Sequence, residues 1–217
     1  MTNTMSTFQF TVDEAFNRQH NEFVRDSRRL QVSAGVLGGI LVVAAVLIFI
    51  FAGHDGAFVL FAIVLGLFGL FSLVMVQVIP RMVGSGQSLY DRYELAPAMV
   101  ARVNPHDVEI MALVNTSVNT DDEPRWALSA RTVARIPGTV REVGERIPSV
   151  AVTATRSVQH KDRWDEINPM PIGWATKNQN VVRDAEAAIA PQQWKMLADN
   201  LDRIDDVMGA KRNLLPL

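Results

Sequence analysis

The sequence contains no cysteine, and two long stretches of it contain no charged residue. Without cysteine the chain can form no disulfide and offers no thiolate ligand to a metal. The charge-free stretches are residues 31–52 and 57–79. As helices they would be roughly 33 and 35 Å long, enough to cross a hydrocarbon core of about 30 Å. The sequence therefore predicts an integral membrane protein with a transmembrane helical hairpin over residues 31–80.

Neither stretch contains an ionisable side chain that could move charge through the bilayer. Ionisable residues inside the membrane mark proton relays, ion pathways and gating charges. The spans also lack the histidine and cysteine that commonly hold haem or an iron–sulfur cluster. We therefore expect no cofactor and no independent transport or electron transfer. The spans should act as an anchor in the lipid bilayer or pack against larger integral membrane subunits.

Small residues recur in both spans at the spacing that brings helix backbones together. Gly35 and Gly39 lie four residues apart in the first span, as do Ala62 and Gly66 in the second. Such faces either hold the two spans against each other or contact another protein, and the pattern does not distinguish these roles. We predict these four residues as candidate contacts to a partner.

The charges that flank the spans predict an orientation. Four arginines (Arg18, Arg25, Arg28 and Arg29) precede the first span, and Arg81 and Arg92 follow the second. The connection between the spans carries no Lys or Arg. Positive residues remain on the cytoplasmic side of a membrane. We expect two spans in the plasma membrane with both termini in the cytoplasm.

Residues 1–30 have the pattern of an amphipathic helix. Thr11 and Glu14 match a capping box, and Val12, Phe16, Phe23 and Leu30 follow at helical spacing. One interpretation is an interfacial segment that uses Phe16 and Phe23 to contact a partner or the membrane surface. The alternative is a helix that packs on the chain's own soluble domain.

The rest of the chain has the pattern of an α+β domain. Residues 81–88 read as a linker, residues 89–190 as a small β-rich cytoplasmic domain, and residues 191–217 as a C-terminal amphipathic helix and tail. Strands are expected at 98–103, 108–115, 125–136 and 149–155. Strands of this number and length suggest a small barrel-like sheet. The proline-rich residues 168–171 should be a loop or an edge strand.

Catalysis, metal binding and nucleic-acid binding have little support. The four histidines are scattered, with no carboxylate at ligand spacing, and no nucleophile motif is present. The domain after the spans is nearly neutral and lacks the basic footprint of a nucleic-acid-binding protein. We predict no catalytic residue, no metal site and no nucleic-acid partner.

One arginine pair raises an alternative function. Arg131 and Arg135 resemble the arginine half of the motif with which PilZ domains bind cyclic dinucleotides, and two arginines can clamp phosphate groups. The second half of that motif is missing. The alternative is a membrane-tethered cytoplasmic sensor that binds a phosphate-bearing ligand through Arg131 and Arg135, or a lipid-headgroup contact at the same residues.

Longer segments of the domain carry a resemblance to a known family. They are residues 113–116, 124–126, 146–151 and above all 164–172 (WDEINPMPI), and the likeness continues through 186–194 and 201–208. The chain resembles a family of corynebacterial two-helix membrane proteins without an assigned activity. A member of about this size is similar to an accessory subunit of the actinobacterial cytochrome bc–cytochrome oxidase respiratory supercomplex. The resemblance implies a non-catalytic accessory, assembly or stabilising subunit of that complex.

Overall fold

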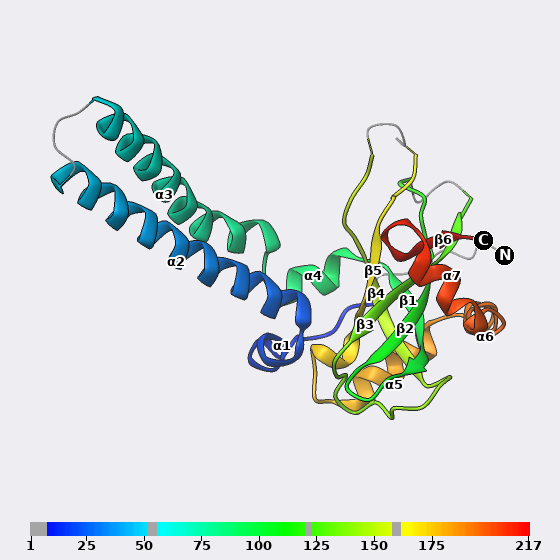
Figure 1. The fold of residues 1–217 in the computed structure, drawn as a ribbon. Coiled ribbons are helices and arrows are strands. Elements are labelled where there is room, and N and C mark those ends of the chain that lie inside the picture. The colour runs from blue at the N-terminus through cyan, green and yellow to red at the C-terminus, as the bar shows by residue number, and fades with distance from the viewer. Residues whose placement is uncertain (1–7, 52–55, 120–122, 158–161) are drawn as a thin grey trace. The chain divides into compact units, whose positions relative to one another are not determined.

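The computed structural model describes residues 8–51, 56–119, 123–157 and 162–217 (Figure 1). The chain divides into two compact units: a helical unit of residues 22–84, and a second unit that combines residues 1–21 with 85–217. Residues 1–7 of the expected amphipathic segment and 53–55 of the expected connection lie outside the described residues, as do the side chains of 79–83.

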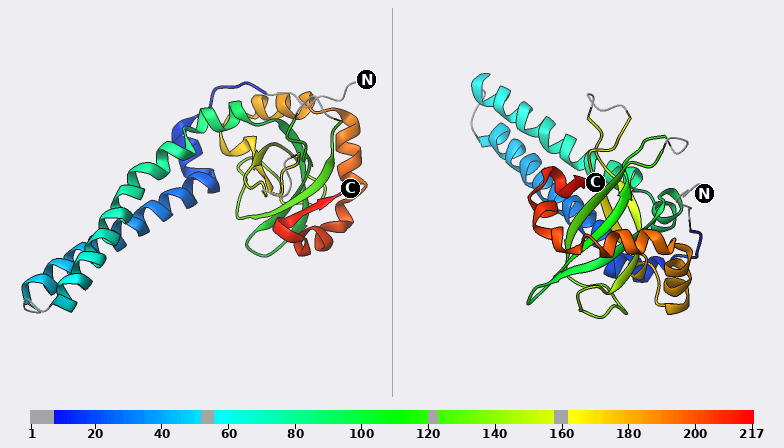
Figure 2. Two further views of the ribbon diagram at one scale, coloured as in Figure 1. Left: turned by 90° about the horizontal axis from the view of Figure 1, so that it is seen from above. Right: turned by 90° about the vertical axis from the view of Figure 1, so that its right-hand side faces the viewer.

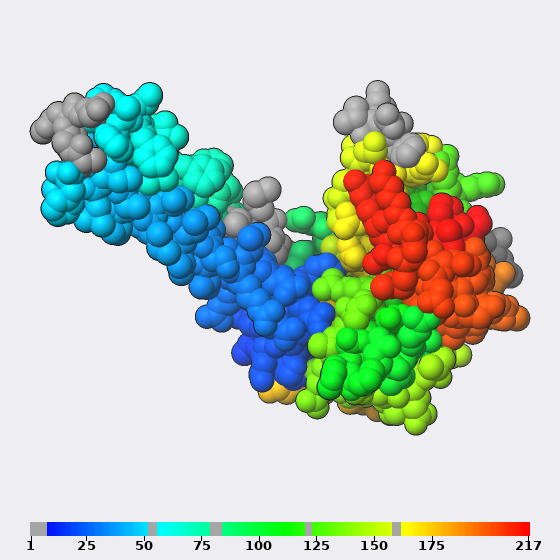
Figure 3. All heavy atoms as spheres, viewed as in Figure 1, coloured from blue at the N-terminus to red at the C-terminus, as the bar shows by residue number. Residues whose placement is uncertain are grey.

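The helical unit consists of two long helices, α2 (Glu22–Phe51) and α3 (Gly56–Val83). Both are long and apolar enough to cross a membrane. Their large apolar side chains point mostly outward, and Phe51 is 80% exposed. Figure 3 shows the outer surface of these helices in blue and cyan. An apolar surface of this extent requires lipid or protein around it. α2 begins at Glu22, ahead of the predicted span that starts at Gln31, because the arginines before the apolar run are good helix formers and continue the helix.

The second unit is built on a six-stranded antiparallel sheet. Its strands are β1 (Leu95–Val103), β2 (Val108–Asn115), β3 (Trp126–Val133), β4 (Arg146–Thr153), β5 (Ile167–Pro171) and β6 (Leu214–Pro216). They are ordered β5-β4-β1-β2-β3-β6. The proline-rich segment forms the edge strand β5, where a residue without a backbone N–H is tolerated.

The sheet curls into a half-barrel (Figure 2). The Ser129 hydroxyl on β3 donates to the Ile167 carbonyl on β5 at 2.5 Å, although three strands separate β3 from β5 in the sheet order. The enclosed core is fully buried and includes Met111, Leu128 and Trp174. The predicted combination of a helical hairpin with an α+β unit and a small barrel-like sheet is confirmed.

The expected C-terminal helix is present but interrupted. α6 (Pro191–Ala198) ends before Asn200, whose side-chain amide donates to the Met196 carbonyl at 2.8 Å, and α7 (Ile204–Gly209) follows a short 3₁₀ turn. α6 packs against β1 and β2, and α7 packs against β3. A further helix, α5 (Gln179–Ala188), was not predicted. The apolar tail is no free extension, because it forms β6 and pairs with β3.

The N-terminal segment differs from the expected amphipathic helix. α1 (Glu14–His20) is capped by Asp13, which accepts from the Phe16 backbone at 3.0 Å, rather than by Thr11. Glu14 does not close a capping box either, since its carboxylate accepts from the Gln87 backbone at the start of α4 (Gly86–Arg92). The free N–H groups of that helix terminus compete for the carboxylate.

Candidate functional site

Small side chains line the contact between α2 and α3. A Cβ added to Gly38 would lie 2.9 Å from the Gly69 carbonyl, and one added to Gly69 would lie 2.9 Å from Val42. Ala45 is buried and lies 3.5 Å from the Cβ that Gly66 would carry. Ala62 is only 5% exposed. Two of the four predicted partner contacts, Ala62 and Gly66, therefore belong to the hairpin's own interface.

The other predicted small-residue pair divides between two environments. A Cβ at Gly35 would meet Val76 at 3.6 Å, so Gly35 lies beside α3. A Cβ at Gly39 would meet nothing within 4 Å. Within the described residues, Gly39 alone of the four lies on an open face of the hairpin.

The open face of α2 has a regular pattern that the sequence analysis missed. Apolar residues recur at alternating spacings of four and three on either side of Gly39, and all of them are exposed: Val32, Val36, Val43, Val46 and Ile50. This is the heptad spacing with which one helix packs along another, and each of these residues is β-branched. The sequence could have revealed it, because a helical projection places this stripe on a different side of α2 from Gly38 and Ala45.

Phe16 and Phe23 do not share one helix face, as the amphipathic interpretation required. Phe16 is buried in the second unit, with its ring 4.2 Å from that of His20 and Lys177 positioned over it. Phe23 is half-buried on α2, in the helical unit. The extended backbone of Asn21 ends α1 and breaks the helical phase between them. For residues 8–21, the alternative interpretation of packing on the chain's own domain is confirmed.

A buried polar cluster in the second unit joins the residues that precede α2 to those that follow α3. Asn21 donates to Asn17 at 2.9 Å and to the Tyr90 hydroxyl at 3.4 Å, and Tyr90 donates to the Pro171 carbonyl at 2.9 Å. Burial raises the pKa of Tyr90 above its ordinary value, so the phenol remains protonated and can donate. Gly86 packs so closely on Asn17 that a Cβ would overlap the amide. Residues just before α2 and just after α3 are thus fastened together.

The arginine pair proposed for a sensor has two different surroundings. The Arg131 guanidinium lies over the Trp174 ring, 5.8 Å from its centre. Arg135 lines a cavity of about 490 Å³ together with His106 and Arg141. Arg141 donates to the Asn104 and Asp107 carbonyls and so ties a turn beside this cavity.

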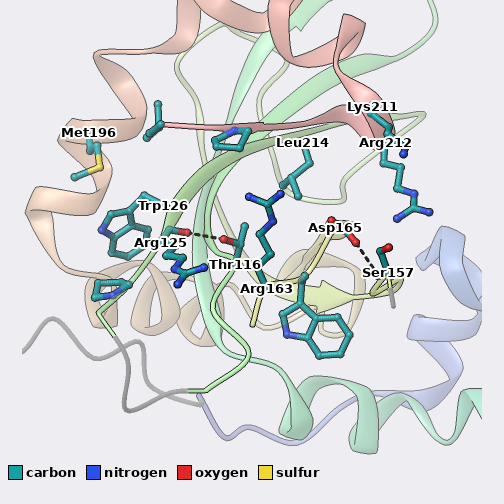
Figure 4. Close-up of a pocket in the computed structure, with 14 residues that line it drawn as sticks. Thr116, Arg125, Trp126, Ser157, Arg163, Asp165, Met196, Lys211, Arg212 and Leu214 are labelled. Atoms are coloured by element: carbon teal, nitrogen blue, oxygen red, sulfur yellow. Dashed lines mark hydrogen bonds between the residues drawn. The ribbon is translucent and has the colours of Figure 1, made fainter. Parts of the chain in front are cut away.

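A larger cavity of about 820 Å³ lies elsewhere on the second unit, between the start of β3, the segment before β5 and the chain around β6 (Figure 4). Arg125, Arg163, Lys211 and Arg212 line it together with Trp126 and Trp164. The sequence analysis did not identify this site. Its residues come from widely separated segments that no local motif connects.

Among the described residues, no group of three His, Cys, Asp or Glu side chains is placed to hold a metal ion. The ionisable groups with shifted pKa values are dispersed: burial raises the pKa of Glu94, and the hydrogen bond from Arg125 lowers the pKa of Asp162.

Comparison with known proteins identifies a relative and a family. No curated protein matches the chain. A crystal structure described as "a putative membrane protein from Corynebacterium diphtheriae" is 51% identical, with a TM-score of 0.55, and the match covers 57% of this chain and 99% of that one. This relative and the two membrane-length helices place the chain in a membrane. A family model described as "Protein of unknown function (DUF3239)" matches residues 81–205. The chain belongs to this family.

Proposed function

We propose that the chain is a non-catalytic accessory subunit that assembles with, or stabilises, a larger membrane complex. The observation that carries the proposal is that α2 has two different faces, one packed against α3 and one exposed. Gly38 and Ala45 close the hairpin, whereas Gly39 and the exposed β-branched stripe lie on another face. A heptad stripe interrupted by one glycine suits a neighbouring transmembrane helix that approaches closely at that point.

The polar groups of the hairpin agree with a packing role. The spans contain no ionisable residue that could move charge across the bilayer. The Ser72 hydroxyl donates to the Phe68 carbonyl of its own helix at 3.0 Å, so it is satisfied internally. Such a hairpin can fill a groove between larger subunits without taking part in their chemistry.

The partner that we propose is the cytochrome bc–cytochrome oxidase respiratory supercomplex. Support comes from the sequence resemblance at residues 164–172 and from the membrane location. The arginines that flank the two charge-free spans favour an arrangement in which the second unit lies in the cytoplasm. The polar cluster of Asn17, Asn21 and Tyr90 would then fasten both connections to the hairpin at the cytoplasmic surface.

The absence of cysteine makes the orientation directly testable. We expect Gly56→Cys, at the first residue of α3, to react with a membrane-impermeant maleimide in intact spheroplasts. The exposed Thr132→Cys on β3 should react only after lysis. Labelling is measured by the mass shift of the purified chain, with the cysteine-free parent as blank. The reverse labelling pattern would place the second unit outside the cytoplasm.

Gly39→Leu tests the accessory-subunit proposal. A leucine there has room in the isolated hairpin but would hold a close helix partner away. We expect about a tenfold loss of cytochrome subunits and haem absorbance in a mild-detergent pull-down from native membranes, equivalent to about 1.4 kcal/mol of binding free energy. Gly56→Leu is the matched control, because that position is also open but lies at the end of α3. If the wild-type chain recovers no cytochrome subunit, the proposed partner is wrong.

The sensor remains the alternative, and one observation favours it: Arg135 lines a cavity of about 490 Å³. It requires saturable binding of a phosphate-bearing ligand that Arg131→Ala abolishes. Because the Arg131 guanidinium lies over Trp174, this variant must also keep the wild-type unfolding temperature before a loss of binding counts as support.

A further inference from the structure

The cavity of about 820 Å³ on the second unit has the size of a small-molecule site. Its walls come from four parts of the chain: Thr116 and the start of β3, residues 157 and 163–165 before β5, Met196 on α6, and the segment 211–217. Figure 4 shows the side chains of Arg125, Arg163 and Arg212 reaching toward this space from different elements. The fold therefore gathers cationic groups that lie far apart in the sequence.

The lining side chains carry an excess of positive charge. Arg125, Arg163, Lys211 and Arg212 are cationic, and Asp165 is the carboxylate among the described lining side chains. Arg125 is also paired with Asp162 at 2.5 Å, and that contact lowers the pKa of Asp162, so the pair is charged at neutral pH. Among the described lining side chains, cationic groups therefore outnumber carboxylates. A phosphate monoester carries a charge of about −1.5 to −2 at pH 7 and can accept paired hydrogen bonds from arginine, so it suits a lining with several cationic side chains.

An unusual backbone conformation at residues 212 and 213 holds Lys211 and Arg212 at the cavity. Arg212 and Asn213 have φ values of 60° and 52°, in the left-handed region that non-glycine residues rarely adopt. The hydrogen bond from the Asn213 backbone to the Ala210 carbonyl and the pairing of β6 with β3 maintain this conformation. Here it places Lys211 and Arg212 in the wall of the cavity that Arg125 and Arg163 also line, rather than along the helix that ends at Gly209.

The remaining wall is apolar and aromatic. Trp126, Trp164, Met196 and Leu214 line the cavity, and the Arg156 guanidinium lies 5.6 Å from the centre of the Trp164 ring. Indole rings stack on flat bodies and also pack against alkyl chains. A ligand that fits both walls combines an anionic group with an apolar or flat body.

We propose that this cavity binds a phosphate ester through Arg125, Arg163, Lys211 and Arg212, with the ligand's organic body against Trp126 and Trp164. The site is separate from the hairpin face that carries the proposed function, and it is distinct from the cavity at Arg135. Two sources supply this chemistry: the headgroup of an anionic phospholipid and a soluble phosphate ester such as a nucleotide.

Calorimetry on the full chain in phosphatidylcholine nanodiscs tests the site with two soluble probes, glycerol 1-phosphate and adenosine 5′-monophosphate. We expect saturable binding of at least one probe, weakened about tenfold or more by Lys211→Gln with Arg212→Gln. Arg163→Gln provides a second variant, because Arg163 lies in a different segment of the chain from Lys211 and Arg212. Arg131→Gln with Arg135→Gln is the matched control, because it removes the same charge from the other arginine pair. A variant is compared with the wild-type chain only if its unfolding temperature equals that of the wild type.

The outcomes separate the two sources. Tighter binding of adenosine monophosphate than of glycerol phosphate indicates a nucleotide-like ligand stacked on tryptophan. Loss of glycerol phosphate binding when phosphatidylglycerol replaces phosphatidylcholine in the nanodiscs indicates that the lipid headgroup occupies the cavity. The proposal is overturned if neither probe binds the wild-type chain, or if binding survives Lys211→Gln with Arg212→Gln. Loss of binding only in the Arg131 and Arg135 variant overturns it as well and supports the sensor site.

Discussion

Trp174→Ala is expected to destabilise the second unit by about 3–5 kcal/mol, the usual cost of deleting a large buried aromatic side chain. Trp174 is fully buried in the curled sheet, and its indole N–H donates to the Arg135 carbonyl at 2.8 Å. The substitution leaves a cavity and removes the hydrogen bond to the Arg135 carbonyl. We expect the unfolding temperature of the full chain in detergent to fall by about 10 °C or more. Near-ultraviolet circular dichroism measures this unfolding.

Two further substitutions separate the contributions to this effect. Trp174→Phe keeps most of the ring but removes the N–H donor, so it should cost about 1–3 kcal/mol. Trp164→Ala removes an indole that is only partly buried at the wall of the larger cavity, and it should cost clearly less than Trp174→Ala. Equal effects of Trp174→Ala and Trp164→Ala would mean that Trp174 does not organise the core.

The membrane hairpin and the sheet were predictable because each depends on a long, redundant signal. The spans lack charge over more than twenty consecutive residues each, and one atypical residue does not change that pattern. The strands carry β-branched residues between turn signals, and the proline-rich edge strand follows from the missing N–H donor. These features are local, so the sequence contains them directly.

The failures have a common physical cause, which is competition from residues distant in sequence. The helical spacing of Phe16 and Phe23 was real, but Asn21 adopts an extended conformation and makes buried hydrogen bonds to Asn17 and Tyr90. Glu14 binds the backbone of Gln87 rather than closing its own capping box. A pattern confined to one segment cannot show that a residue about seventy positions away offers a better partner.

The candidate sites show the same limit. Gly38 and Gly39 are adjacent and chemically identical, yet one lies against Gly69 and the other lies on an open face. Only the phase of α2 relative to α3 distinguishes them. Similarly, the pair Arg131 and Arg135 has motif-like spacing but different surroundings, whereas Arg125, Arg163 and Arg212 have no shared motif and line one cavity.

A disulfide between Ala45→Cys and Gly66→Cys is expected to form readily in this otherwise cysteine-free chain. The Ala45 Cβ lies 3.5 Å from the Cβ that Gly66 would carry, within the range of about 3.5–4.5 Å that a disulfide requires. Oxidation in native membranes should give nearly complete bridging. It is measured as the loss of maleimide labelling under denaturing conditions, with each single-cysteine variant as control.

Adding Gly38→Leu to this cysteine pair should reduce bridging about tenfold or more, whereas Gly39→Leu should leave it unchanged. The leucine at position 38 would overlap the Gly69 carbonyl and Leu73, so the helices must separate by more than a disulfide can span. The leucine at position 39 meets nothing within 4 Å in the hairpin. If Gly39→Leu then loses the cytochrome subunits while it retains the disulfide, the loss comes from the open face of α2 and not from a damaged hairpin. Equal bridging in both variants would contradict the close contact of Gly38 with Gly69 and would remove the basis for assigning Gly39 to a partner.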